Sequence, residues 1–312
     1  MHFPFTLKKD TDFDVVGFGT NAVDFLIQVP TYPEFTSKIE LTDYQQAAGG
    51  EIATSIVGLQ RLGLRTSYVG RFGSDAAGEI GLDSLRREGV DLTYAETIEG
   101  AQTQIAFIVI DEQSGERTVI WKRDAKLHYT ETDVPLDAVS STKVLHFTPH
   151  DARACLRLAE SARSRGTIVS IDIDNMFSGV EELLGSVDII IASSDFPRKL
   201  LGEVDHRTAL REMQHRYGAA VVGVTLGETG SLLLCGDDFI ESSGFEVPGG
   251  CKDTTGAGDS FRVGLIYGLI TGQSVEDSAR IANAVAALKC RAVGARTALP
   301  TPDELNSLLE KN

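Results

Sequence analysis

A short polar run between glycines carries the clearest chemical signal in the sequence: Gly249-Gly250-Cys251-Lys252-Asp253-Thr254-Thr255-Gly256-Ala257-Gly258-Asp259. The apolar run Phe261 to Ile270 follows, with apolar residues at the four-residue spacing of a helix. Free backbone amides of Gly256, Ala257 and Gly258 would then lie at the positive end of the helix dipole, where phosphates bind. Asp259, in the first turn, could take the proton from a hydroxyl that attacks a phosphate.

The same residues also fit an ordinary glycine turn before a helix that begins with an aspartate, because an acid there suits the helix dipole. Context decides between the two interpretations. Asp253 to Asp259, followed by Val263-Gly264, resembles the C-terminal signature of the ribokinase-like (PfkB-type) carbohydrate kinase family. The resemblance implies that Gly256 to Gly258 form an anion hole and that Asp259 is the base that activates a sugar hydroxyl.

The N-terminal strand leads to a second candidate residue. Asp14 to Gly19 is a short apolar run that ends in glycines and imitates a dinucleotide-binding fingerprint. That fingerprint requires a helix next, whereas apolar residues alternate over 23–29 and predict a strand, so we reject it. Asp24 lies just past the end of the first strand, where α/β sheets bind ligands. The resemblance implies that Asp24 holds sugar hydroxyls.

The run Ala47-Ala48-Gly49-Gly50 opens a predicted helix that ends at Gly63. The segment resembles the family's N-terminal signature, in which a di-glycine hinge leads into a substrate-binding helix. Many members carry asparagine four residues after the second glycine, and this chain has Thr54 there. Threonine offers fewer hydrogen bonds than asparagine. We therefore expect Gly49, Gly50 and Thr54 to contact the substrate, without a fixed choice of sugar.

Alternating apolar residues over 103–111 and 116–122, with a turn between them, predict a β-hairpin. Together with Phe25–Val29 and Lys38–Leu41 it would form a small antiparallel sheet. An ordinary edge hairpin is the alternative interpretation. The resemblance implies that this sheet is a lid over the sugar and often a dimer interface, so we expect a homodimer.

The lid subdomain would take in about 24–46 and 101–126 of a single kinase domain spanning 1–312. Phe107 and Trp121 are candidate walls of the sugar site. Lys122 and Arg123 are the nearest cations that could meet an acidic or phosphorylated sugar, although exposed charges after a strand are usually solvated.

From Lys143 onward, predicted strands and helices alternate along the chain. Strands are expected at 144–147, 167–172, 187–192 and 219–225. This order predicts an α/β fold with a mostly parallel sheet covered by helices on both faces. The resemblance implies the ribokinase-like version of that fold.

The resemblance also assigns the nucleotide contacts. The segment Val224 to Glu228, at a strand end, resembles the family's ATP-contact strand, so Thr225 and Gly227 are candidates. Asn283, on a helix of small residues, would wall the adenine. Gly256 and Gly258 would hold the phosphates of ATP.

The family's magnesium motif, Asn-x-x-Glu, is replaced by Ser193-Ser194-Asp195-Phe196, so Mg²⁺ is expected to rest on the nucleotide phosphates, with its protein ligands unknown. By resemblance, Asp253 and Thr255, with the loop from Arg291 to Ala295, would form a monovalent-cation site for an ion such as K⁺.

Composition narrows the classes of partner. The chain has 312 residues, a formal net charge of −16 and a pI near 4.8, which argue against nucleic acid and anionic membrane as partners. The four cysteines are scattered, no run reaches the length of a membrane span, and the N-terminus lacks a signal-peptide core. We therefore expect a cytoplasmic protein with reduced thiols.

The function predicted from these features is an ATP-dependent sugar kinase. The alternatives are a nucleoside kinase of the same fold, a 6-phosphosugar kinase, and a sugar-binding protein without catalysis. A nucleoside kinase would need an aromatic sandwich for the base, which the sequence does not clearly show. A 6-phosphosugar kinase would need cations clustered near the lid. A binding protein would most simply lack an acid at Asp259.

Overall fold

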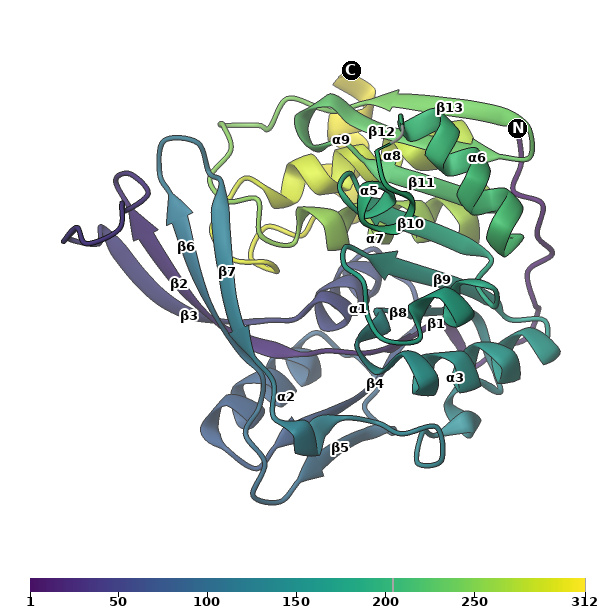
Figure 1. The fold of residues 1–312 in the computed structure, drawn as a ribbon, viewed down its shortest axis with the longest axis horizontal. Coiled ribbons are helices and arrows are strands. Elements are labelled where there is room, and N and C mark those ends of the chain that lie inside the picture. The colour runs from purple at the N-terminus through teal and green to yellow at the C-terminus, as the bar shows by residue number, and fades with distance from the viewer. Residues whose placement is uncertain (204, 312) are drawn as a thin grey trace.

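A large central sheet organises the molecule, and a computed structural model describes residues 1–203 and 205–311 of it (Figure 1). The strands of this sheet are β1 (Phe13–Phe18), β4 (Thr66–Gly73), β5 (Ala95–Ile98), β8 (Thr142–Phe147), β9 (Ile168–Ile173), β10 (Ile189–Ser193), β11 (Val221–Thr225), β12 (Gly230–Cys235) and β13 (Asp238–Ser243). Across the described residues their order is β13-β12-β11-β10-β9-β8-β1-β4-β5, and only the pairs made by β12 are antiparallel. The predicted, mostly parallel α/β architecture is confirmed.

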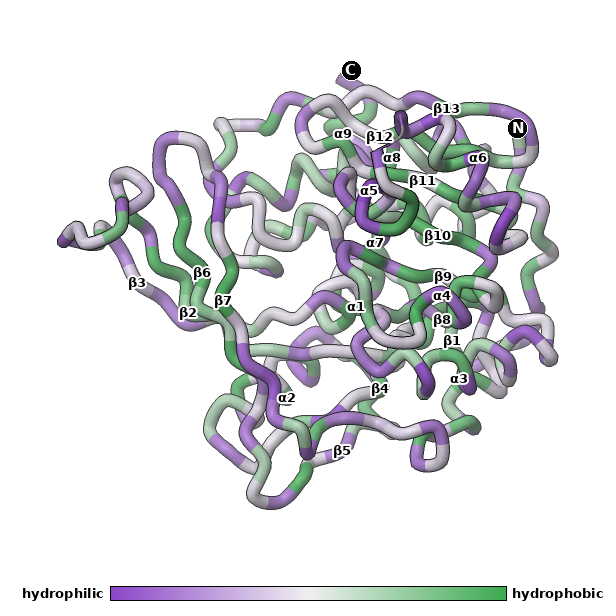
Figure 2. The backbone as a smooth tube through the Cα atoms, viewed as in Figure 1, coloured by the Kyte–Doolittle hydropathy of each residue, from purple (hydrophilic) through white to green (hydrophobic). Residues whose placement is uncertain are grey.

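Helices cover both faces of this sheet, which is why its central strands are apolar throughout. The helices are α1 (Glu51–Arg61), α2 (Ala76–Arg87), α3 (Ala152–Ser164), α4 (Val180–Leu184), α5 (Phe196–Leu201), α6 (His206–Tyr217), α7 (Ala257–Ile270), α8 (Val275–Lys289) and α9 (Pro302–Lys311). Short 3-10 turns lie at Ala125–Leu127, Leu136–Val139, Pro149–Asp151 and Gly227–Thr229. One core cluster packs α1, α7, α8 and α9 on one face, and another packs α3, α4 and α6 on the other. Figure 2 shows the hydrophobic residues running through β10 and β11 inside the molecule.

A second, smaller sheet projects to one side, at the left of Figure 1. It consists of β2 (Ala22–Val29), β3 (Asp43–Gly49), β6 (Ile105–Asp111) and β7 (Arg117–Lys122), in the order β3-β2-β6-β7. The β2–β3 and β6–β7 pairs are antiparallel, while β2 and β6 run parallel. The hairpin predicted at 103–122 is therefore confirmed.

The strand expected at Lys38–Leu41 is wrong, because that stretch has no regular structure and the strand lies at Asp43–Gly49. Ala47 and Ala48 pair with Asp24 and Val23 of β2, so the strand runs up to the glycine pair. The helix α1 begins only after Gly50, whose positive φ of 90° ends the strand. The sequence placed the two alanines at the helix start instead.

The two faces of the small sheet differ in burial. The inner face carries Leu26, Ala106, Ile108 and Ile110, which are buried against Val293. The alternate positions face outward, because side chains of a strand alternate between faces.

No helix in the described part of the chain has the length and apolar character needed to cross a membrane.

Candidate active site

A cleft of about 1460 Å³ opens at the carboxyl ends of β9, β10 and β11, beside the N-terminus of α7 and the inner face of the small sheet. Ligands of open α/β sheets bind at this edge. The cleft brings together these residues predicted from the sequence: Asp24, Gly50, Trp121, Thr225, Gly227, Thr255, Gly256, Ala257, Gly258, Asp259 and Asn283. Gly49, Thr54, Phe107 and Asp253 do not line it.

The glycine loop ends in the cap of α7. Gly256 has a φ of 78°, in the left-handed region that favours glycine, and a Cβ there would lie 3.0 Å from the Cβ of Ala295. The Ala257 amide donates to the Thr254 carbonyl at 3.1 Å, so the expectation that it is free is wrong: the turn itself uses it. Within residues 1–203 and 205–311, the amides of Gly256, Gly258 and Asp259 have no protein acceptor. Free amides at the positive end of a helix dipole suit an anion, so the predicted anion site would lie here.

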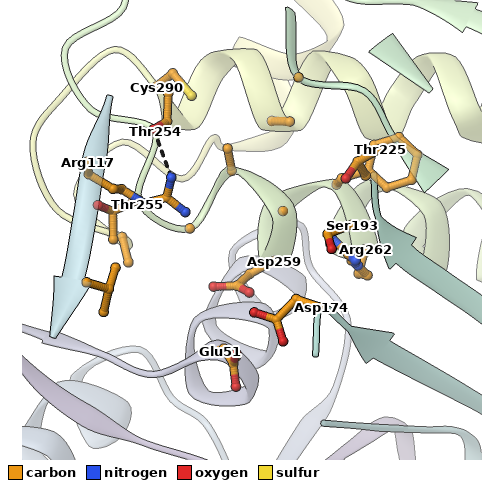
Figure 3. Close-up of a pocket in the computed structure, with 18 of the residues that line it drawn as sticks. Glu51, Arg117, Asp174, Ser193, Thr225, Thr254, Thr255, Asp259, Arg262 and Cys290 are labelled. Atoms are coloured by element: carbon orange, nitrogen blue, oxygen red, sulfur yellow. Dashed lines mark hydrogen bonds between the residues drawn. The ribbon is translucent and has the colours of Figure 1, made fainter. Parts of the chain in front are cut away.

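Acidic side chains from separate elements meet beside this anion site (Figure 3). Asp259 lies in the first turn of α7, Asp174 follows β9, and Glu51 begins α1. Burial and the neighbouring Asp172 carboxylate raise the pKa of Asp259 well above its usual range, while Arg262 and Arg117 oppose that shift. A raised pKa makes Asp259 a stronger proton acceptor once it is ionised.

Arg262 pairs with Asp172 beneath this group. Its Nη2 lies 2.6 Å from Asp172 Oδ1 and donates to the Ile191 carbonyl at 2.9 Å. The side chain is 3% exposed, and its Nε has no partner in the described structure. Sequence reasoning missed this pair, although an arginine inside the apolar run Phe261 to Ile270 was a visible signal.

Asp24 lines the end of the cleft where the sequence predicts the phosphoryl acceptor, called the acceptor end below. It is 4% exposed, and no described group donates a hydrogen bond to its carboxylate. Burial raises the pKa of Asp24 to about 7, with Arg296 opposing the shift and Asp253 adding to it. A Cβ at Gly49 would collide with this carboxylate, which explains the glycine.

Gly49 and Thr54 lie behind the residues that line the acceptor end of the cleft. Thr54 is fully buried, and its Oγ1 accepts from Arg296 Nε at 3.4 Å. Arg296 also donates to the Gly49 carbonyl and to Ser84 Oγ, the latter at 3.1 Å. The expectation that Gly49 and Thr54 contact the substrate directly is corrected, because neither reaches the cleft and the Thr54 hydroxyl is already engaged.

Aromatic rings wall the same end. The Trp121 ring lies 5.8 Å from His150, which lies 4.9 Å from Phe177. His150 Nδ1 lies 3.6 Å from Glu51 Oε2. The Thr20 hydroxyl donates to that carboxylate oxygen at 3.3 Å. Burial, with Arg123 adding to it, lowers the pKa of His150 to about 4, so the ring is neutral near pH 7.

Phe107 does not share this wall. Trp121 pairs with Ala106 on the inner face of the small sheet, so Phe107 points outward. Its ring stacks on Phe25 with centroids 4.8 Å apart and is 41% exposed. The prediction that Phe107 walls the sugar site is therefore wrong.

The other end of the cleft lies over β10 and β11. Thr225 and Gly227, which are predicted to contact the nucleotide, line it together with Ser193. Asn283 also lines it, but its Nδ2 donates to Ser231 Oγ at 3.1 Å and to the carbonyl and hydroxyl of Ser242. These bonds hold β12 and β13 against α8, so only the Asn283 carbonyl oxygen remains for a ligand.

Residues 14–302 match the model of the pfkB family carbohydrate kinases, which covers most of the chain. The chain belongs to this family. It is 28% identical over 299 residues to a nucleoside kinase of Methanothermobacter thermautotrophicus, covering 94% of both chains. It is 28% identical over 299 residues to a ribokinase of Haemophilus influenzae, covering 94% of this chain and 97% of the relative. The structure of an Arabidopsis thaliana ribokinase complexed with ribose and ATP superposes with a TM-score of 0.81 at 26% identity, covering 96% and 99%.

As in its relatives, the expected chemistry of this PfkB-family protein is that of a sugar or nucleoside kinase. In the described part of the chain, no group of three or more His, Cys, Asp or Glu side chains is arranged to hold a metal ion. Asp174 and Asp259 nonetheless both line the cleft near the start of α7 (Figure 3), and carboxylate oxygens suit Mg²⁺. This donor set fits a magnesium ion that arrives with a nucleotide and is held mainly by its phosphates.

Proposed function

We propose that this PfkB-family kinase transfers the γ-phosphate of ATP to a hydroxyl of a small carbohydrate, with Asp259 as the general base. One observation carries the proposal: Asp259 stands beside the free amides of Gly258 and of its own backbone, in the same cleft as the unpaired carboxylate of Asp24. A general base, a site for a phosphate and a carboxylate that can accept hydrogen bonds from hydroxyls thus share one cavity. The relatives are named as kinases of sugars and nucleosides, which supports the reaction class.

Positioning and charge stabilisation dominate phosphoryl transfer, because its transition state is loose. In this proposal Asp24 accepts hydrogen bonds from the acceptor's hydroxyls and fixes its orientation. Asp259 takes the proton of the attacking hydroxyl, late in the step, since a sugar hydroxyl is a far weaker acid than a carboxylic acid. The amides at the start of α7 stabilise the charge on the moving phosphoryl group. Magnesium bound to ATP would offset the negative charge of Asp172, Asp174 and the phosphates.

The small sheet would act as the lid of a single kinase domain, with the lid formed by about 24–46 and 101–126. Its tip already reaches the glycine loop: the Gly115 carbonyl accepts from the Thr254 amide and hydroxyl, both at 3.2 Å. Arg117 Nη1 donates to Thr254 Oγ1 at 3.1 Å (Figure 3). A lid closed in this way excludes water from the phosphoryl group and limits ATP hydrolysis.

The outer face of this lid would form the interface of a homodimer. Tyr44, Phe107 and Ile120 are 48%, 41% and 59% exposed there. Exposed apolar groups gathered on one sheet face favour burial against a partner. Sedimentation of the purified chain tests this part, and a monomer at all concentrations would contradict it.

A second candidate, a nucleoside acceptor, is favoured by Trp121 and His150. Both line the acceptor end, and the neutral His150 ring and the half-exposed Trp121 indole are surfaces on which a base could stack. A phosphorylated sugar is disfavoured, because Arg123 is paired with Asp151 at 2.8 Å and Lys126 donates to the Gly100 carbonyl. Lys122 lies on the outer face, in register with Ile105.

The deciding experiment is ADP release with Mg²⁺ and ATP across hexoses, ketoses, pentoses, keto-deoxy acids, phosphorylated sugars and nucleosides. A responding sugar whose turnover is lost in Asp259→Asn supports the proposal. A nucleoside response with none from free sugars would replace the acceptor class. Binding of a sugar without any turnover would favour a non-catalytic binding protein.

A further inference from the structure

Lys289, the last residue of α8, has a buried ammonium group beneath the glycine loop. Its side chain is fully buried, and its Nζ donates to the Asp253 carbonyl at 2.7 Å. The same Nζ lies 3.9 Å from Asp253 Oδ2, in a residue that is also fully buried. A buried ammonium is costly unless polar groups compensate it. Lys289 therefore occupies a polar site built around Asp253.

The other bonds of Asp253 show what this site does. Its Oδ1 accepts from the Thr255 amide and its Oδ2 from the Gly294 amide, both at 2.8 Å. The carboxylate therefore ties the start of the segment 253–259, called the anion loop below, to the loop that follows α8. The Lys289 ammonium ties the end of α8 into the same junction. The residues just before the proposed anion-binding amides are therefore held by contacts among the start of this loop, the end of α8 and the loop that follows α8.

The groups around the ammonium are those that would bind an alkali-metal ion. They are a carboxylate, a backbone carbonyl and, close by, the Thr255 hydroxyl, whose Oγ1 is buried without a partner in the described structure. Hard monovalent and divalent cations prefer such oxygen ligands. An ammonium is likewise a compact single positive charge with three donors. Asp253 and Thr255 are the residues for which the sequence suggested a monovalent cation, and Lys289 brings a positive charge to them from within the chain.

We propose that the Lys289 ammonium serves as a built-in monovalent cation for this kinase, so that the anion loop is braced without added K⁺. The inference rests on the proposed function for its catalytic consequence, but its structural part stands alone. The positive charge lies behind the loop that carries Gly256 and Gly258, so it also favours an anion on the cleft side. A soluble ion would find its place taken, because the Asp253 carbonyl already accepts from Nζ and the Asp253 carboxylate lies 3.9 Å from it.

The first arm of the test uses the wild-type chain in tetramethylammonium chloride, a cation too large for the site. ADP release with the responding acceptor is compared before and after replacement of this salt by KCl at constant ionic strength. We expect the rates to agree within about twofold. A saturable activation by K⁺ of about tenfold or more would overturn the proposal, because that size corresponds to a distinct bound cation.

The second arm compares Lys289→Ala with Lys289→Met. The alanine variant opens space for an ion beside Asp253, whereas methionine keeps the volume of the lysine stem without its charge. We expect both to lose about tenfold or more of the activity in tetramethylammonium salt, since a buried carboxylate is left unpaired. KCl or NH₄Cl should restore the alanine variant saturably and leave the methionine variant impaired. Full activity of Lys289→Met would overturn the proposal, since the charge would then be dispensable.

A third arm does not depend on catalysis. The thermal midpoint of each protein is measured in tetramethylammonium chloride and in KCl at equal ionic strength. We expect K⁺ to raise the midpoint of Lys289→Ala by about 2 °C or more and to leave the wild type unchanged. A wild type that K⁺ stabilises specifically would overturn the inference, even if neither variant folds. If no acceptor responds, the proposed function fails while this arm still decides the role of Lys289.

Discussion

Replacing Asp24 by asparagine should separate stability from function in this protein. The carboxyl is 4% exposed, and burial raises its pKa from 3.8 to about 7 against the opposing charge of Arg296, with Asp253 adding to the rise. A shift of about 3 units, at about 1.4 kcal/mol each, sets an upper bound of about 4 kcal/mol on its cost when ionised. Relaxation around the charge will reduce this figure, so we expect between about 1 and 4 kcal/mol.

The direction in which the free energy of unfolding changes with pH follows from proton binding. Between pH 4 and 7 the folded state holds a proton on Asp24 that the unfolded chain has lost, using the ordinary value of 3.8 and the shifted value of about 7. The free energy of unfolding therefore falls as pH rises through that window and levels off above it. Asparagine does not titrate, so Asp24→Asn should remove this slope and be the more stable protein at about pH 8.

The assay is urea unfolding at several pH values across this range for the wild type and for Asp24→Asn. Asp14→Asn is a control of opposite sign: burial pushes the pKa of Asp14 up, but bonds from Arg65 and Lys143 outweigh it and lower the pKa to about 2. Stability from Asp14 is present above pH 3.8 and is lost as pH falls toward 2, so this variant should be less stable than the wild type near neutrality. Parallel pH profiles of the wild type and Asp24→Asn would refute the reasoning.

The same Asp24→Asn variant should lose activity while it gains stability. A hydrogen bond from an acceptor hydroxyl to a carboxylate contributes about 1.5–3 kcal/mol, and asparagine keeps one accepting oxygen. Loss of one such bond should lower kcat/KM by about 10- to 150-fold. ADP release measured against acceptor concentration checks this loss. Unchanged kcat/KM would mean that the acceptor binds away from Asp24.

Further outcomes follow from other residues of the cleft. Asp259→Asn should lower kcat by about 100- to 10,000-fold with acceptor binding nearly unchanged, as calorimetry would show; turnover near wild type would exclude it as the base. Arg262→Met should lower the free energy of unfolding by about 3–5 kcal/mol, because Asp172 stays buried and unpaired, whereas Arg207→Met at the exposed pair with Glu241 should cost under about 1 kcal/mol; equal losses would contradict this. In Arg262→Met protein that still folds, the acid limb of the pH profile of kcat/KM should move to higher pH, because Arg262 no longer opposes the raised pKa of Asp259. Gly256→Ala should cost about 1–2 kcal/mol, since its φ is 78°, and should weaken ATP binding; a variant as stable as the wild type would mean that the loop adopts another conformation.

Local patterns predicted the parts of the fold that depend on local chemistry. The glycine loop and the apolar run after it predicted α7, and alternation predicted β2, β6 and β7. Alternation fixes which residues share a face but not which face meets the core. For this reason Trp121 was placed in the cleft correctly and Phe107 was not.

Contacts between distant segments were beyond reach of the sequence. Thr54 has the predicted position after the glycine pair, yet its hydroxyl is taken by Arg296, which lies 242 residues later. The strand expected at Lys38–Leu41 was misplaced because Ala47 and Ala48 suit a helix locally, whereas pairing with β2 makes them a strand. Both errors arise where tertiary contacts override local preference.

We expect the cleft of this acidic protein to bind anions through buried charges rather than through exposed lysines. The cations beneath it are Arg262, Lys289 and Arg296, which are 3%, 0% and 6% exposed, and the sequence predicted none of them. Salt screens such groups far less than exposed lysines. The affinity for ATP with Mg²⁺ should therefore fall by less than about fivefold between about 0.05 and 0.5 M salt, measured by calorimetry. A steep loss across that range would instead assign nucleotide binding to exposed cations, with the amides of α7 in a minor role.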